Sequence, residues 1–317
     1  MKKIFKVLLA APLALSFLLV GTACDYEITK RPGKKTSITD DSGEIVIGNW
    51  IAVDKTVFEY DDENTSTSIH YTWSMEKNAW QEDYKSETQY NDKGDWVMQT
   101  DYRWDEWTGE WIGSFKIVVD DQNKTHIHYS WDSELYDWRI SSKQVSIWDG
   151  DFPIREEQYN WSNETNDWVL YGIGRYEYDD REATSLIEWS HYNEYTHNWV
   201  YERKTEMEYS EDWKIWTSTE YWWQNDSWVK SGKHIEEFND FDATSSLIDY
   251  RWVEEDSDWK ENRKRTYQYN KNKKCILEME YNWSYETNSY VESGKTVNTY
   301  NEDGRQTLSV RFVLQEI

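Results

Sequence analysis

Two histidines, His126 and His128, stand two residues apart. This spacing puts both imidazoles on one face of a strand, where they could share a metal ion. The repeats supply no matching third ligand, so we expect no metal centre. Acidic turns such as residues 61–64 and 239–242 could hold Ca²⁺ weakly, but they lack the regular ligand spacing of a calcium-binding loop. We expect these turns to be solvated and the protein to use no cofactor.

The 61 Asp and Glu residues could include a carboxylate pair that cleaves a glycosidic bond, because two carboxyl groups about 5 to 10 Å apart are sufficient. A catalytic unit should also interrupt the repeat described below with residues of its own. The irregular places are the short unit after Trp111, the turn at 148–153 and a Trp cluster within 213–223. None of them supplies a nucleophile with a base, a Gly-rich phosphate loop or a Cys/His cluster. We therefore expect a protein that is not an enzyme, with an enzyme that processes envelope polysaccharide as an alternative.

Several aromatic residues stand outside the regular positions of the repeat and are the ones we expect to be exposed. Trp and Tyr rings present an apolar face and can stack on sugars. We predict a binding surface for a glycan or a protein, formed by Trp96, Trp107, Trp213, Trp216 and Trp222. If these rings only complete packing at edges, the protein is instead a purely structural spacer.

The elements that position these residues come from a repeat of about 30 residues that begins at Trp50 and recurs nine times. Each unit opens with an aromatic residue, usually has Tyr followed by Asp or Asn ten residues later, and closes with Tyr-x-Trp. The opening positions are Trp50, Trp80, Trp111, Trp138, Trp168, Trp199, Trp228, Trp259 and Tyr290. Because ten is an even number, we expect the opening and the middle aromatic to share one face of a strand.

Within a unit the apolar residues recur with period two, which indicates strands. Trp80, Tyr84 and Tyr90 alternate with polar residues, and the segment 90–94 has the Asn and Gly of a tight turn. Each unit is thus a predicted β-hairpin, and nine hairpins give about 18 strands. A sheet wider than about ten strands tends to curl. We expect an all-β fold of tandem antiparallel hairpins in a curled or spiral sheet, or solenoid, with the aromatics inside and each unit touching its neighbours.

The segment Tyr300-Asn301-Glu302-Asp303-Gly304-Arg305 resembles the Tyr-Asp-x-x-Gly-Arg repeat of the Rhs/YD proteins. With its Trp-flanked polar loops, the array from Trp50 to Ile317 is similar to uncharacterised Bacteroidetes lipoproteins with tandem repeats of this kind. The resemblance implies a hairpin array in the cell envelope. Most units lack the Gly and the Arg, so toxin delivery, as in true Rhs proteins, is not expected.

The N-terminal segment has the layout of a secretory signal. Lys2, Lys3 and Lys6 precede an apolar run at 7–20, which is shorter than a membrane-spanning helix. The small residues 21–23 and Cys24 then resemble a bacterial lipobox, although Gly21 stands where Leu is usual. The resemblance implies lipidation of Cys24, with ordinary secretion as the alternative. We expect a signal peptide at 1–23, a flexible polar tether at 24–48 and the repeat array at 49–317.

The net charge of the chain limits the classes of partner that it can bind. The chain has a formal net charge of −26, and removal of the leader would take away three more Lys. Such a surface repels nucleic-acid phosphates and anionic bilayers. We expect no nucleic-acid partner and contact with a membrane only through lipid at Cys24. The expected location is the bacterial cell envelope, at the outer membrane or the cell surface.

Overall fold

The computed structural model describes residues 46–47, 50–61 and 64–314, which form one antiparallel sheet and contain no helix. The strands are β1 (Val46–Ile47), β2 (Trp50–Tyr60), β3 (Thr65–Ser74), β4 (Ala79–Tyr90), β5 (Trp96–Asp105), β6 (Glu110–Asp120), β7 (Thr125–Asp132), β8 (Asp137–Asp149), β9 (Phe152–Ser162), β10 (Asp167–Tyr178), β11 (Thr184–Asn193), β12 (Asn198–Tyr209), β13 (Ile215–Gln224), β14 (Ser227–Phe238), β15 (Thr244–Val253), β16 (Asp258–Tyr269), β17 (Cys275–Ser284), β18 (Ser289–Tyr300) and β19 (Gln306–Leu314). The predicted all-β class and the tandem hairpins are confirmed.

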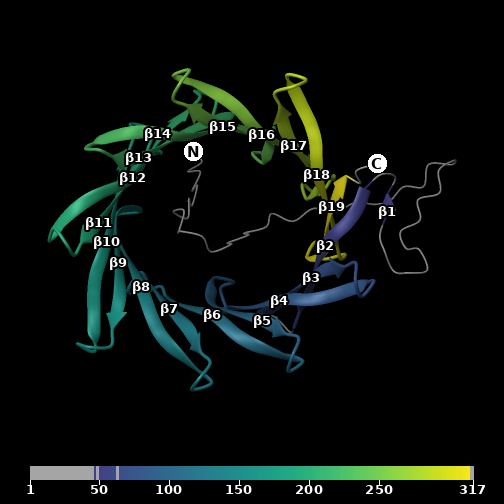
Figure 1. Ribbon diagram of the computed structural model, residues 1–317, viewed down its shortest axis with the longest axis horizontal. Coiled ribbons are helices and arrows are strands. Elements are labelled where there is room, and N and C mark those ends of the chain that lie inside the picture. Colours follow the sequence, from purple (N-terminus) through teal and green to yellow (C-terminus); the bar gives the residue numbers. More distant parts are fainter. Residues whose placement is uncertain (1–45, 48–49, 62–63, 315–317) are drawn as a thin grey trace.

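The sheet closes on itself. Each strand from β2 to β18 pairs with the next, and β19 returns to pair with β2, so the strands form a ring (Figure 1). At this seam Phe312 is the partner of Ala52, and Val310 is the partner of Lys55. The expected spiral or solenoid is therefore wrong, because the fold is a closed barrel. A spiral would leave two strand edges unpaired, and here each edge pairs with the other.

A β-bulge recurs in every unit, three residues after the opening aromatic. In β4, Glu82 is the partner of Tyr71 and Tyr84 is the partner of His70, so Asp83 is the extra residue. The nine extra residues are Val53, Asp83, Ser114, Ser141, Tyr171, Glu202, Ser231, Asn262 and Ser293. One extra residue reverses the alternation of side chains beyond it. The opening and middle aromatics therefore lie on opposite faces of the sheet, and the expectation that they share a face is wrong.

The opening aromatics define what we call the Trp-pair face. All of them except Trp50 pack edge-on against the aromatic across their loop, as Trp161 and Trp168 do with ring centroids 5.1 Å apart. Equivalent pairs recur at Trp73/Trp80, Trp104/Trp111, Trp131/Trp138, Tyr192/Trp199, Trp223/Trp228, Trp252/Trp259 and Trp283/Tyr290. This edge-to-face geometry is the one favoured by the ring quadrupoles.

Lysines reinforce this face. Eight of the nine units have Lys five residues after the opening aromatic, and the unit of Trp168 has Ile173 there. Lys85 Nζ lies 4.2 Å from the ring centroid of Tyr102, and Lys204 Nζ lies 4.5 Å from that of Tyr221. Cation–π contacts of this kind join neighbouring strands, so the lysines have a structural role on an otherwise acidic protein.

Complete burial is rare in this barrel. Only nine hydrophobic residues of the described chain are buried. They include one cluster at the seam, around Phe312, and another around Ile187, Trp189 and Met207. Barrels of 16 to 18 strands are too wide for side chains to fill. The sheet is thus a single layer whose two faces both stay partly accessible.

The hairpins give the barrel two unlike rims. The eight loops that link the aromatic pairs, from β3–β4 to β17–β18, lie at one end, and we call this end the Trp-loop rim. The Tyr-Asp and Tyr-Asn turns lie at the other end, the turn rim. There Asn91 Oδ1 accepts backbone N–H groups from Lys93 and Asp95 at 2.9 and 3.0 Å, which explains why Asp or Asn usually follows the Tyr. Because β2 begins and β19 ends at the Trp-loop rim, the array is joined to the preceding residues at that end.

Candidate functional site

The strongest asymmetry of the surface is the exposure of apolar side chains on the Trp-loop rim. Trp107 is 96% exposed and Tyr195 is 97% exposed, each at a loop tip. Within the described residues, every large apolar side chain that is more than half exposed lies in these loops, and the set is Met75, Trp107, Leu135, Tyr136, Tyr195 and Tyr285. On the turn rim, the most exposed large apolar side chain is that of Trp213, at 43%.

Acidic side chains surround these tips. Each of the eight loops contains at least one carboxylate, namely Glu76, Glu106, Glu134, Glu164, Glu194, Asp226, Asp256 or Glu286. Lys77 is the only Lys or Arg between the strands there, and its Nζ lies 3.1 Å from Glu106 Oε1 in the next loop. The rim therefore combines exposed ring faces with hydrogen-bond acceptors, an arrangement that suits polyhydroxylated ligands and basic peptides.

A hollow of about 450 Å³ lies on this rim between the β15–β16 and β17–β18 loops. Its lining includes the half-buried Trp259 and Trp283 together with Tyr285, and polar groups from Arg251, Asp256, Asp258, Lys260 and Asn288. This hollow was not predictable from the sequence, since Arg251 and Tyr285 are far apart in the chain. A Tyr inside a loop that is otherwise polar was the available signal.

The structure separates the five aromatic residues predicted to bind ligand. Trp107 is at a tip of the Trp-loop rim, and Trp222, 44% exposed, is near that end of β13 as the partner of Arg203. Trp96 and Trp213 lie at the turn rim. Trp216 packs against the cluster around Ile187 and Met207. The five rings therefore do not make one contiguous strip.

Trp213 has a left-handed backbone with φ at +61°, as do the residues at the equivalent position of other turns, among them Gly94, Glu182 and Gly304. A bulky residue in this left-handed region is strained. Its ring lies 4.7 Å from the guanidinium of Arg181, which also donates to the backbone oxygens of Tyr209 and Ser210. Trp213 thus helps join two neighbouring turns.

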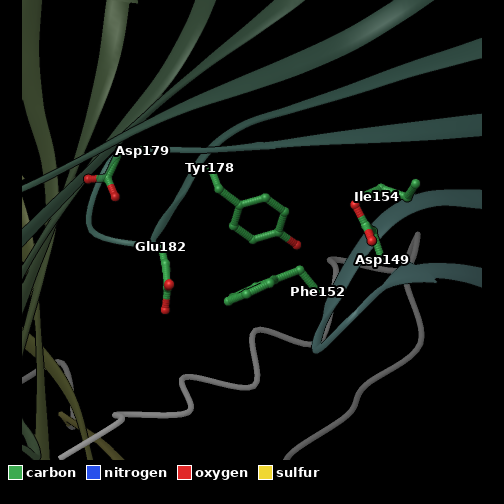
Figure 2. Close-up of a pocket in the computed structure, with 6 residues that line it drawn as sticks. All are labelled: Asp149, Phe152, Ile154, Tyr178, Asp179 and Glu182. Carbon is green, nitrogen blue, oxygen red and sulfur yellow. The ribbon is translucent and has the colours of Figure 1, made fainter. Parts of the chain in front are cut away.

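The turn rim has a smaller hollow of about 200 Å³, which lies between the β8–β9 turn and the β10–β11 turn. Figure 2 shows the ring of Phe152 beside that of Tyr178, and their centroids are 5.0 Å apart with the ring planes tilted by 57°. Asp149, Asp179 and Glu182 surround them. The carboxylate of Asp179 already accepts hydrogen bonds from the backbone N–H and the Nε of Arg181. Its charge is therefore paired within the turn.

The two histidines of the metal hypothesis pack against aromatic rings. His126 lies edge-on to Trp96 and His128 lies edge-on to Phe115, with centroids 5.8 and 5.4 Å apart. Burial lowers the pKa of both imidazoles, that of His128 to about 4. No group of three or more His, Cys, Asp or Glu side chains in the described residues is arranged to hold a metal ion.

His234 should make stability depend on pH. It lies on β14 between Asp249 of β15 and Glu220 of β13, and its hydrogen bond to Asp249 together with the nearby Glu220 carboxylate raises its pKa to about 9. Because the folded pKa exceeds the unfolded value near 6.5, the stabilisation is complete below about pH 6.5 and is lost as the pH rises through about 9. The side chain is 36% exposed, so solvent screening limits the effect to about 1 to 2 kcal/mol.

This expectation can be checked by urea denaturation between pH 6 and 9.5. The free energy of unfolding of the wild type should fall over this range, and that of His234→Gln should fall less. Equal pH profiles for the two proteins would contradict the assignment.

No helical segment in the described part of the chain has the length and hydropathy needed to cross a membrane.

Comparisons with known proteins give no family. No protein-family model and no curated protein matches the sequence. Among solved structures, a Bacteroides fragilis protein of unknown function is 15% identical with a TM-score of 0.37, over 39% of this chain and 91% of that one. A porin-like protein from Bacteroides uniformis is 7% identical with a TM-score of 0.40, over 84% and 95% of the two chains. At these identities and TM-scores, the likeness carries no information on function.

Proposed function

We propose that the protein is a non-enzymatic lipoprotein of the cell envelope that binds a glycan or a protein at the Trp-loop rim. The observation that carries the proposal is the concentration of strongly exposed apolar side chains on this rim alone, at loop tips such as Trp107 and Tyr195. Side chains of this kind are enriched at binding surfaces. A purely structural spacer would have no use for them at one end only.

The proposed anchor is lipid on Cys24, which lies outside the described residues. The 25 residues from 25 to 49 would reach at most about 85 Å if fully extended. Intact mass of the mature protein tests the anchor, because lipidation adds acyl chains to Cys24. A lipid-free mass, or one lowered by two hydrogens through a Cys24–Cys275 disulfide, would exclude it.

The binding rim is tested with a triple variant, Trp107→Ser, Tyr136→Ser and Tyr195→Ser. These side chains are 77 to 97% exposed, so each change should alter the free energy of unfolding by no more than about 0.5 kcal/mol. Capture of ligand on a glycan array and in pull-downs from envelope extracts should fall at least about tenfold, since stacked aromatic contacts are lost.

Trp213→Ser on the turn rim is the matched control. It should leave capture unchanged, and a loss equal to that of the triple variant would place binding on the turn rim instead. Absence of any capture by the wild type would favour the structural spacer. Release of sugars from envelope polysaccharide would identify an enzyme and overturn the proposal.

A further inference from the structure

We infer that the hollow between the β15–β16 and β17–β18 loops is a subsite for a neutral sugar ring, with Tyr285 as its stacking surface. The inference rests on the proposed function and names the ligand class for one part of the same rim. It depends on how Tyr285 is held, on the polar groups around it and on the local balance of charge.

Tyr285 differs from the other aromatic loop tips because its ring is fixed in place. Its hydroxyl donates to the backbone oxygen of Glu261 at 3.0 Å, and Arg251 Nε donates to the same hydroxyl at 3.3 Å. The Arg251 guanidinium lies 5.2 Å from the ring centroid. Tyr285 nevertheless stays 56% exposed. A ring covered on one face and held by two hydrogen bonds loses little conformational entropy when a ligand stacks on the other face.

The polar groups of the hollow are also held. Lys260 Nζ lies 3.3 Å from Asp256 Oδ2 and 3.4 Å from Asp258 Oδ2, so the two carboxylates are fixed by one cation. Their remaining lone pairs, together with the Asn288 amide, can bind hydroxyl groups. The half-buried Trp259 and Trp283 add apolar surface. The volume of about 450 Å³ lies within the range of small-ligand sites.

Charge selects a neutral ligand. Arg251 and Lys260 nearly balance Asp256, Asp258 and Glu261 within the hollow, so a cation gains little there. The net charge of −26 opposes the approach of anionic glycans. A sugar supplies what remains unpaired, namely an apolar ring face for Tyr285 and hydroxyl groups for the carboxylates and the amide.

The combination occurs at one place in the ring. Arg103 in β5 directly precedes Trp104, as Arg251 in β15 precedes Trp252. However, the β7–β8 loop has Ser133 at the position that Tyr285 occupies in the β17–β18 loop. Met75 has the position of Tyr285 in the β3–β4 loop but has no aromatic ring. One pair of loops therefore departs from the repeat, as a specific site requires.

The experiment uses the mature protein, an array of neutral glycans, and titration calorimetry with the best neutral oligosaccharide. Saturation-transfer NMR with methyl hexosides reports which sugar protons face the rings. Tyr285→Ala and Arg251→Ala should each weaken binding at least about tenfold, the first by removing the stacking ring and the second by releasing it. Arg103→Ala and Ser133→Ala, which alter the positions equivalent to Arg251 and Tyr285 outside the hollow, should bind as the wild type does.

Three outcomes would overturn the inference. If a neutral glycan binds equally well to Tyr285→Ala, the ligand lies elsewhere on the rim and the proposed function still stands. If no neutral glycan binds but the triple rim variant loses a protein ligand, the sugar class is wrong and the rim is still the binding surface. If neither set of variants changes any capture, the inference and the proposed function both fail.

Discussion

Phe312→Ala is expected to lower the free energy of unfolding by about 3 to 5 kcal/mol and to open the barrel at its seam. Phe312 is 2% exposed and packs with Ala52, which is fully buried, and with Val310. Among the described strands, these three residues belong to the only neighbouring pair that no hairpin loop connects. Truncation of the ring leaves a cavity where closure depends entirely on packing and on the ladder between β19 and β2.

Opening would expose two unpaired strand edges, which readily pair with other chains. The expected signs are a lower urea midpoint and, by light scattering, oligomers that grow with protein concentration. Met207→Ala is the control, since Met207 is buried at 8% exposure in the other cluster. It should lower stability while the protein stays monomeric. Oligomers from both variants, or from neither, would show that Phe312 is not needed to close the ring.

Trp168→Ala is expected to cost about 2 to 4 kcal/mol. Trp168 is half-buried, packs edge-on against Trp161 with centroids 5.1 Å apart, and lies 4.8 Å below Lys143 Nζ. The loss combines buried apolar area, worth about 1.5 to 3 kcal/mol, with the aromatic pair, worth about 0.5 to 1.5 kcal/mol.

Urea denaturation followed by far-ultraviolet circular dichroism measures this cost. Trp107→Ala is the matched control, because Trp107 is 96% exposed and should change stability by less than about 0.5 kcal/mol. Equal midpoints for the two variants would mean that the repeated aromatic pairs contribute little to the fold.

The hairpins were predictable from the sequence because strands and turns are local. Alternation around Trp80 and the Asx residue after Tyr90 determine where a strand runs and where it turns. The bulge at Asp83 was not predictable, since a polar residue at that position reads as part of the same alternation. The faces of the middle aromatics were assigned wrongly for this reason.

Closure of the sheet into a barrel could not be predicted from the sequence, for a different reason. It depends on the rotation between neighbouring hairpins summed over the whole array, so a small difference per unit separates a spiral from a ring. The candidate site likewise combines features that a local pattern reveals with features that depend on how the hairpins are arranged. The exposure of Trp107 was predicted from its position outside the repeat and is confirmed. The contact of Tyr285 with Arg251 depends on a twist between hairpins that no local pattern reports.

The seam between β19 and β2 occupies the same place in the ring as a hairpin loop. Leu314 and Trp50 are partners across it, in the position that an aromatic pair and its loop occupy in the rest of the ring. The nine units therefore have no first or last member in space, and the termini mark one of nine nearly equivalent cuts. A circular permutant, in which a polar loop like 162–167 joins Leu314 to Trp50 and new ends open in another loop, would retain every pairing among strands β2 to β19.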